Sequence, residues 1–206
     1  GIYIHDMTLA VASGADLDVV ASAEKLQAMF IAVWEGTAES DEYNALLLNA
    51  GLDWREVAIL RALSRYLRQI GIAYGQDLMA GTLNRYPDVA RALVELFHTR
   101  FDPNHPRCDD RDAAQMELSS RIGEMCAEIT SLADDTVVNR FENLILSTVR
   151  TNVFQTAEDG SPVRTFAFKL DPARVIGKTR EDLRDAGAIE RDAESWASLS
   201  AALAAH

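Results

Sequence analysis

Residues 34–72 constrain the fold most strongly, because they contain a complete set of start and stop signals for helices. Asp53 is a residue type that caps helices, and Glu56 follows three positions later, as in a capping box. Gly51 precedes this helix and Gly71 follows it, and glycine commonly ends a helix. The segment therefore predicts a short helix that ends near Gly51 and a long helix that runs from Asp53 to Gly71.

The predicted long helix has an apolar face and a basic face. At the helical spacing of about 100° per residue, one face gathers the apolar side chains. These residues are Ile59, Leu60, Leu63, Tyr66, Leu67 and Ile70. A second face carries Arg61, Arg65 and Arg68, which we call the arginine ridge. The apolar face predicts packing against other helices.

An acidic cluster precedes the long helix and consists of Glu39, Asp41 and Glu42. Arginine offers two parallel donors to a carboxylate. We therefore expect Glu39 or Asp41 to pair with Arg61 or Arg68 inside one fold, or these charges to lie solvated at the surface. A phosphate or nucleotide site on the arginine ridge is the alternative.

The same segment also resembles a known protein family. The motifs that carry the resemblance include Trp34, Gly36, Glu39–Asp41, Tyr43, Asn44, Ala50–Val57 (AGLDWREV), Leu60–Ala62, Tyr66–Gly71 (YLRQIG), Tyr86, Pro87, Leu96, Phe97, Arg100–Pro103 (RFDP), Arg150–Asn152 and Phe168–Asp171 (FKLD). Over roughly residues 1–175 the chain is similar to the large bacterial NAD-dependent glutamate dehydrogenases. The resemblance implies the helical region that follows the N-terminal regulatory domains and precedes the catalytic domain. It also implies that the chain is a piece of a far longer enzyme.

Composition and charge exclude several classes of protein. The chain has 206 residues, of which 48% are hydrophobic, enough for one sizeable core. It has no run of 18 apolar residues and no secretory signal pattern, so we expect a soluble, cytoplasmic protein with no membrane partner. The only cysteines, Cys108 and Cys126, do not form a disulfide framework. The net charge of −12 argues against nucleic-acid binding.

The pattern as a whole predicts a mainly α fold, a helical bundle with an N-terminal strand and a C-terminal β-hairpin. Residues 1–15 contain the strand and, by resemblance, end an upstream regulatory-type domain. Residues 16–150 form the helical domain. Residues 151–175 form the hairpin, which by resemblance begins the catalytic domain. Residues 176–206 depart from the family and form a divergent helical tail.

Helical spacing predicts which residues of the helical domain face inward. In chain order they are Val19, Leu26, Phe30 and Val33; Val89, Leu93, Leu96 and Phe97; Leu118, Ile122, Met125, Ile129 and Leu132; and Val138, Phe141, Ile145 and Val149. The helix at 112–132 is expected to pack on the next helix, at 135–149. In the hairpin, with its turn at Asp159–Gly160, the face of Phe166, Phe168 and Leu170 is expected to be available for association.

The sequence contains no complete active site. No GxGxxG turn is present to seat a dinucleotide, and the only lysines are Lys25, Lys169 and Lys178. We therefore predict no catalytic and no cofactor-binding residue, with NAD implied only for the full-length enzyme. His98, His105, Cys108 and Cys126 lack metal-site spacing, so no metal is expected. Asp134 and Asp135 are interpreted as helix caps rather than catalytic acids.

We predict a structural or interdomain role for a limited set of residues. These are Glu39, Asp41, Asn44, Arg61, Arg68, Gln69, Arg150, Asn152 and Lys169. The segment Arg150–Asn152 is interpreted as a hinge between helix and hairpin.

Two functions are consistent with the sequence. The first is a noncatalytic helical region that links the regulatory domains to glutamate oxidation in a large dehydrogenase. The second is a stand-alone helical regulatory or interaction module derived from such an enzyme. Whether the chain is itself an enzyme stays open. The expected partners are other domains or subunits of the same enzyme, in a homo-oligomer.

Overall fold

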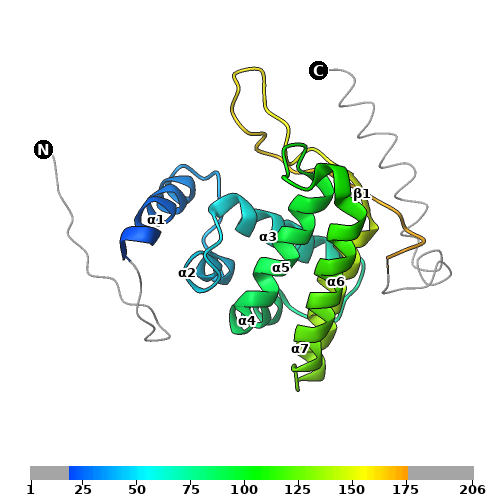
Figure 1. Ribbon diagram of the computed structural model, residues 1–206. Helices are drawn as coiled ribbons and strands as arrows, with labels where there is room; N and C mark the ends of the chain where they lie inside the picture. The colour runs from blue at the N-terminus through cyan, green and yellow to red at the C-terminus, as the bar shows by residue number, and fades with distance from the viewer. Residues whose placement is uncertain (1–18, 176–206) are drawn as a thin grey trace, which may run out of the picture.

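The computed structural model describes residues 19–175. The predicted N-terminal strand and the predicted helical tail lie outside these described residues. In chain order the elements are α1 (Val19–Trp34), the 3₁₀ helix η1 (Glu42–Ala45), α2 (Leu46–Asn49), α3 (Trp54–Gln69), α4 (Gln76–Arg85), α5 (Pro87–Phe101), the 3₁₀ helix η2 (Cys108–Asp110), α6 (Arg111–Ala127), α7 (Leu132–Ser147), β1 (Thr148–Thr151) and β2 (Phe168–Leu170). The mainly α fold with a C-terminal hairpin is therefore confirmed (Figure 1).

The ends of α3 follow from the local sequence. Oδ1 of Asp53 accepts hydrogen bonds from the backbone N–H groups of Arg55 and Glu56, both at 2.8 Å. Oε2 of Glu56 accepts from the backbone N–H of Asp53 at 2.7 Å, which completes the predicted capping box. Gly51 has φ +67° and Gly71 has φ +85°, a backbone conformation that residues other than glycine rarely adopt. The predicted start and stop signals are thus confirmed.

The core lies where α3, α4, α5 and α7 meet, with α2 and η1 closing one side. Its largest fully buried side chains include Tyr43, Leu46, Ile59, Leu60, Leu63, Leu67, Met79, Leu83, Leu93, Leu96, Phe97 and Phe141. The apolar face predicted for α3 therefore packs inward, although Tyr66 and Ile70 are only partly buried. Figure 1 shows α5, α6 and α7 side by side, with α1 at the opposite side of the molecule.

The prediction that α6 packs on α7 is confirmed only in part, because α6 contacts α7 but packs most extensively on α5. The prediction also extended this helix to Leu132, whereas α6 ends at Ala127. Leu132 instead begins α7 and is 80% exposed. Ile122 is the most deeply buried residue of α6. Only part of the apolar face predicted for this helix therefore lies in the core.

Two further residues predicted to face inward are exposed. Phe30 is 57% exposed, because α1 packs mainly against α2 and α3 and buries Met29 and Ala32 instead. Val149 is 51% exposed, because it lies in β1 rather than in α7. In a strand, successive side chains point to opposite faces, and the helical spacing used for the prediction no longer applies.

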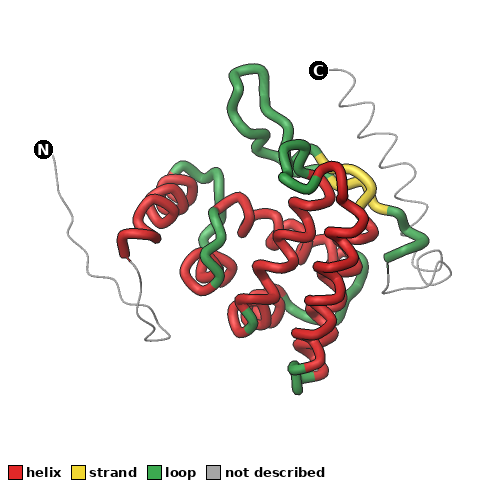
Figure 2. Tube along the Cα trace, viewed as in Figure 1, coloured by secondary structure: helices red, strands yellow, loops and turns green. Residues whose placement is uncertain are grey.

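The hairpin is confirmed, but its first strand lies earlier than predicted. β1 and β2 pair antiparallel, with Arg150 opposite Lys169 and Thr151 opposite Phe168. The long connection between them, green in Figure 2, has an isolated bridge between Thr156 and Pro162. The predicted turn is present, and Gly160 has φ +78°.

Aromatic packing attaches the hairpin to the helices. The ring centroid of Phe97 in α5 lies 6.1 Å from those of both Phe154 and Phe168. The side chains of Phe166, Phe168 and Leu170 are partly buried, whereas Ala167 and Lys169 between them are exposed. The predicted alternation is therefore present. The core covers part of the face that was expected to be free for association.

Candidate interdomain site

A buried arginine organises the acidic cluster. Arg61 is 5% exposed, and its Nε and Nη2 donate to the two carboxylate oxygens of Asp41 at 2.6 and 2.7 Å. Nη2 of Arg61 also donates to Oδ1 of Asn44 at 2.7 Å, and Nδ2 of Asn44 donates to the carbonyl oxygen of Glu39 at 2.9 Å. The predicted pairing of Asp41 with Arg61 is confirmed, and it fixes the segment before η1 on α3.

The other members of the arginine ridge behave differently. Arg65 pairs with the carboxylate of Glu39 at the surface. Arg68 and Gln69 lie exposed at the end of α3. The alternative pairing of the acidic cluster with Arg68 was wrong, because Arg68 lies two helical turns beyond Arg61, or about 10 Å along the axis. Asp41 cannot reach both residues.

Arg55 joins α3 to the hairpin, a role that the sequence did not reveal. Its Nη2 donates to the carbonyl oxygen of Val153 at 2.9 Å, and its Nη1 donates to that of Val163 at 3.2 Å. The guanidinium carbon lies 5.6 Å from the ring centroid of Trp54 and 5.2 Å from that of Phe166. Burial lowers the pKa of Arg55 from its ordinary value. The local sequence around Arg55 does not indicate these partners, which lie 98 and 108 positions further along the chain.

Asn152 holds the two arms of the hairpin together. Its Nδ2 donates to the carbonyl oxygen of Thr165 at 2.9 Å, and its Oδ1 accepts from the backbone N–H of Ala167 at 2.7 Å. Arg150 and Lys169 are opposite each other in the strand register, and both are exposed. Of the three hairpin residues predicted to have a structural role, Asn152 has the clearest structural contacts.

A second set of contacts joins α5 to the hairpin. Nη2 of Arg100 donates to the carbonyl oxygens of Leu146 and Thr148 at 3.2 and 3.0 Å. The ring of His98 meets that of Phe154 edge-on, with centroids 5.2 Å apart. Nε2 of His98 also lies 3.6 Å from Oε1 of Glu56. Burial raises the pKa of Glu56 above its ordinary value. The end of α7 and the hairpin are thus held from both α3 and α5.

The remaining candidate residues serve the fold. Asp134 does not cap α7; Ser131 does, by accepting from the backbone N–H of Asp134 at 3.3 Å. The Asp134 carboxylate is buried, accepts from Oγ1 of Thr82 at 2.7 Å and pairs with Arg85. Burial alone would raise its pKa, but the bonds from Thr82 and Arg85 outweigh this and lower it.

The cysteines are also part of the packing. Burial raises the pKa of Cys126 to about 11, which keeps the thiol protonated. Sγ of Cys108 donates to the carbonyl oxygen of His105 at 2.7 Å. Within residues 19–175, no group of three or more His, Cys, Asp or Glu side chains is placed to hold a metal ion.

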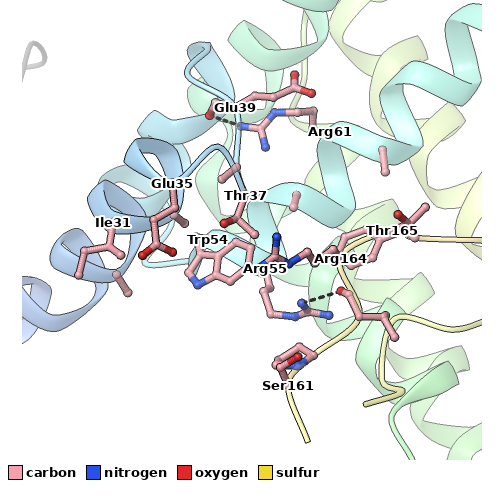
Figure 3. A pocket seen from close by; sticks show the side chains of 18 of the residues that line it. Ile31, Glu35, Thr37, Glu39, Trp54, Arg55, Arg61, Ser161, Arg164 and Thr165 are labelled. Carbon is pink, nitrogen blue, oxygen red and sulfur yellow. Dashed lines mark hydrogen bonds between the residues drawn. The ribbon is translucent and has the colours of Figure 1, made fainter. Parts of the chain in front are cut away.

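An open pocket of about 690 Å³ lies between α1, α3 and residues 161–166, which follow the turn of the hairpin and which we call its tip. In Figure 3, Trp54 and Arg55 occupy its centre, with Ile31 and Glu35 of α1 on one side and Arg164 and Thr165 of the hairpin on the other. Glu39, Arg61 and Arg65 also line it. Charged groups from three separate parts of the chain therefore meet at one cavity.

Comparison with known proteins divides the chain into two matched segments. Residues 38–103 match the family model described as glutamate dehydrogenase, helical motif 3. Residues 121–181 match the model described as bacterial NAD-glutamate dehydrogenase, catalytic domain. The second match begins within α6 and includes α7 and the hairpin. Arg55 therefore joins the two matched segments.

Curated relatives agree with these matches. The NAD-specific glutamate dehydrogenase of Halomonas elongata is 41% identical over 175 residues, which is 85% of this chain and 11% of the relative. That of Pseudomonas aeruginosa is 37% identical over 84% of the chain and 11% of the relative. That of Mycobacterium tuberculosis is 34% identical over 73% of the chain and 9% of the relative.

The fold and the site define a helical unit in which Arg55 holds the hairpin of the segment that matches the catalytic-domain model. The chain is homologous to part of the large NAD-specific glutamate dehydrogenases, as its motifs predicted. It spans only about a tenth of the length of the relatives that it matches, 9–11% in the three cases. In the described part of the chain, no helix is both long and apolar enough to cross a membrane.

Proposed function

We propose that this chain is a noncatalytic helical region of a large cytoplasmic NAD-dependent glutamate dehydrogenase, in which it links regulatory domains to the catalytic domain. The full enzyme would oxidatively deaminate L-glutamate to 2-oxoglutarate and ammonia, with NAD as the cofactor. The names of the relatives support the reaction and the cofactor. The lack of a GxGxxG turn supports a noncatalytic role for the chain itself.

The contact between Arg55 and the hairpin carries this proposal. Arg55 lies in the segment that matches helical motif 3, and both of its carbonyl acceptors lie in the segment that matches the catalytic domain. A charged donor with two fixed acceptors holds its partner in one orientation. A shift of α3 would therefore be transmitted to the first strands of the catalytic domain.

The packing around this contact makes the connection stiff. Phe97 of α5 contacts the rings of Phe154 and Phe168, and Arg100 binds the carbonyl oxygens at the end of α7 and in β1. In this proposal, residues 16–150 act as the helical domain and residues 151–175 supply the first strands of the catalytic domain, although the match to the catalytic-domain model already begins at residue 121. The motif residues Asp41, Asn44 and Arg61 stabilise the helical domain behind the contact.

A chimeric enzyme tests the proposal. The 175-residue segment of the Halomonas elongata enzyme that matches this chain is replaced by the corresponding part of this chain. We expect the chimera to reduce NAD with glutamate. We expect Arg55→Ala in the chimera to lower kcat about tenfold, the effect of losing hydrogen bonds from a charged group. NADH absorbance measures both rates.

The control is Arg121→Ala, which removes an exposed arginine of α6 outside the predicted interdomain set and should leave kcat unchanged. The chain of 206 residues alone should neither reduce NAD nor bind it in a calorimetric titration. A folded chimera without activity would reject the linking role. Tight binding of NAD to the chain alone would reject the noncatalytic role.

Association is the second part of the proposal. We expect the chain to form a homo-oligomer, because α1 exposes an apolar surface where the stacked rings of Phe30 and Trp34 lie 6.1 Å apart. Light scattering over a range of concentrations should show a mass above that of one 22.7 kDa chain. Trp34→Ser should lower the degree of association. A strict monomer at high concentration would contradict the expectation.

A further inference from the structure

We propose that the pocket between α1, α3 and the hairpin binds a small oxyanion carried on a flat body, such as a nucleoside monophosphate or an aromatic carboxylic acid. The bound ligand would clamp the tip of the hairpin to α3. This inference concerns a ligand site in the chain itself and stands independently of the linking role proposed above.

Arg61 is a buried cation that has N–H donors available for a ligand. Its side chain is 6% exposed, yet it lines the pocket. Its hydrogen bonds to Asp41, Asn44 and Glu39 use Nε and Nη2. With the residues that the structure describes, Nη1 forms no hydrogen bond, so two N–H donors stay available to a ligand. Asp41 holds this guanidinium in place before any ligand arrives.

The balance of charge sets the kind of anion. Arg55, Arg61, Arg65 and Arg164 line the pocket together with Glu35 and Glu39. Counting Asp41, which neutralises Arg61, the balance is one positive charge. The chain as a whole has a net charge of −12, so this local balance runs against the overall composition. A ligand of one or two negative charges fits the pocket better than a polyphosphate.

The rest of the lining favours a flat body. The rings of Trp54 and Phe166 both line the pocket, and the guanidinium of Arg55 lies over each of them. Ala58 and Ala62 keep the wall on α3 low, because their side chains are short. The volume of about 690 Å³ is far larger than a bare phosphate and falls within the range of small-molecule sites. Stacking on aromatic rings and guanidinium groups is common for flat ligands.

The position of the pocket explains the clamp. The wall on α3 belongs to the segment that matches helical motif 3, and residues 161–166 belong to the catalytic-domain segment. The tip of the hairpin is held to α3 chiefly by Arg55 through the carbonyl oxygen of Val163. An anion that contacts both Arg61 and Arg164 would add a second link across the same junction.

Calorimetric titration of the full 206-residue chain tests the proposal, with AMP and indole-3-acetate as probes. We expect saturable single-site binding of at least one probe, with a Kd below about 1 mM. Adenosine, which has no anion, and inorganic phosphate, which has no ring, should bind at least about tenfold more weakly. Binding of AMP alone would identify a phosphate ligand. Binding of indole-3-acetate alone would identify a carboxylate.

Variants locate the site. Ala58→Leu fills the pocket and should weaken binding at least about tenfold, whereas Ala23→Leu on the exposed side of α1 should not change it. Arg164→Gln changes an exposed residue, keeps the fold and should weaken binding about fivefold. Arg61→Ala is unsuitable, because it also breaks the ion pair with Asp41.

Amide hydrogen exchange reports the clamp. The bound probe should slow exchange in residues 161–166, at the tip of the hairpin. It should not slow exchange at Gly123 and Glu124, which are exposed on α6. The proposal is overturned if neither probe gives saturable binding, or if Ala58→Leu, shown to be folded by its thermal melt, binds as tightly as the unaltered chain. Equal binding of adenosine and AMP would also overturn it.

Discussion

We expect Asp41→Ala to lower the free energy of unfolding by about 2 to 4 kcal/mol, because it leaves a buried arginine without its carboxylate. The side chain of Arg61 is 6% exposed, and Asp41 accepts from both Nε and Nη2. Asp41 also caps η1 by accepting from the backbone N–H of Tyr43 at 3.0 Å. The Asp41 side chain is one third exposed, which keeps the effect below that of a fully buried pair.

Urea denaturation of a double-mutant cycle measures this effect. Arg61→Ala and the double variant complete the cycle. The losses of unfolding free energy in the two single variants should add up to more than the loss in the double variant, by more than about 1 kcal/mol. Arg68→Ala is the matched control and should change stability by less than about 0.5 kcal/mol, because Arg68 is exposed. Additive effects of the two single changes would show that the ion pair does not couple these residues.

The second large effect is expected at Phe97. Its ring is fully buried and lies 4.9 Å from the ring centroid of Phe101 and 6.1 Å from those of Phe154 and Phe168. Phe97→Ala should therefore lower the free energy of unfolding by about 3 to 5 kcal/mol through lost contacts and a new cavity. Faster amide exchange in β1 and β2 should accompany the loss, because this ring supports the hairpin.

Phe30→Ala provides the comparison for Phe97→Ala. Both changes remove the same side chain from a helix, but Phe30 is 57% exposed on α1. Its loss should cost less than about 1 kcal/mol, as is usual for surface positions. Thermal or urea unfolding of the two variants under the same conditions measures the difference. A loss below about 1 kcal/mol for Phe97→Ala as well, without faster amide exchange in β1 and β2, would show that the hairpin does not depend on Phe97.

The local sequence predicted those features that depend on near neighbours. The capping box of Asp53 and Glu56, the left-handed glycines Gly51 and Gly71 and the turn at Gly160 all follow from groups within a few residues. The motifs from Ala50 to Gly71 and from Arg150 to Asp171 predicted the homology with glutamate dehydrogenases. The pairing of Asp41 with Arg61 was within reach of the sequence, because both lie in one segment of it.

The packing partners were harder to predict. Periodicity shows that a helix has an apolar face but not which helix covers that face, since any complementary surface buries the same area. The sequence therefore suggested that α6 packs on α7, whereas it packs chiefly on α5. For the same reason the inward side of α1 was predicted only in part: Leu26 and Val33 pack against the core, but Phe30 lies exposed.

The amino-acid sequence by itself determined where α3 begins and ends, that a hairpin follows the helices, and which enzymes the chain resembles. Only the tertiary structure decided that Arg55 binds the carbonyl oxygens of Val153 and Val163, and that α1, α3 and the hairpin enclose one pocket. Helix caps and turns are made by groups close in sequence, whose geometry is nearly the same in any protein. Contacts between residues about a hundred positions apart depend on how every intervening element packs, and no local signal records that arrangement.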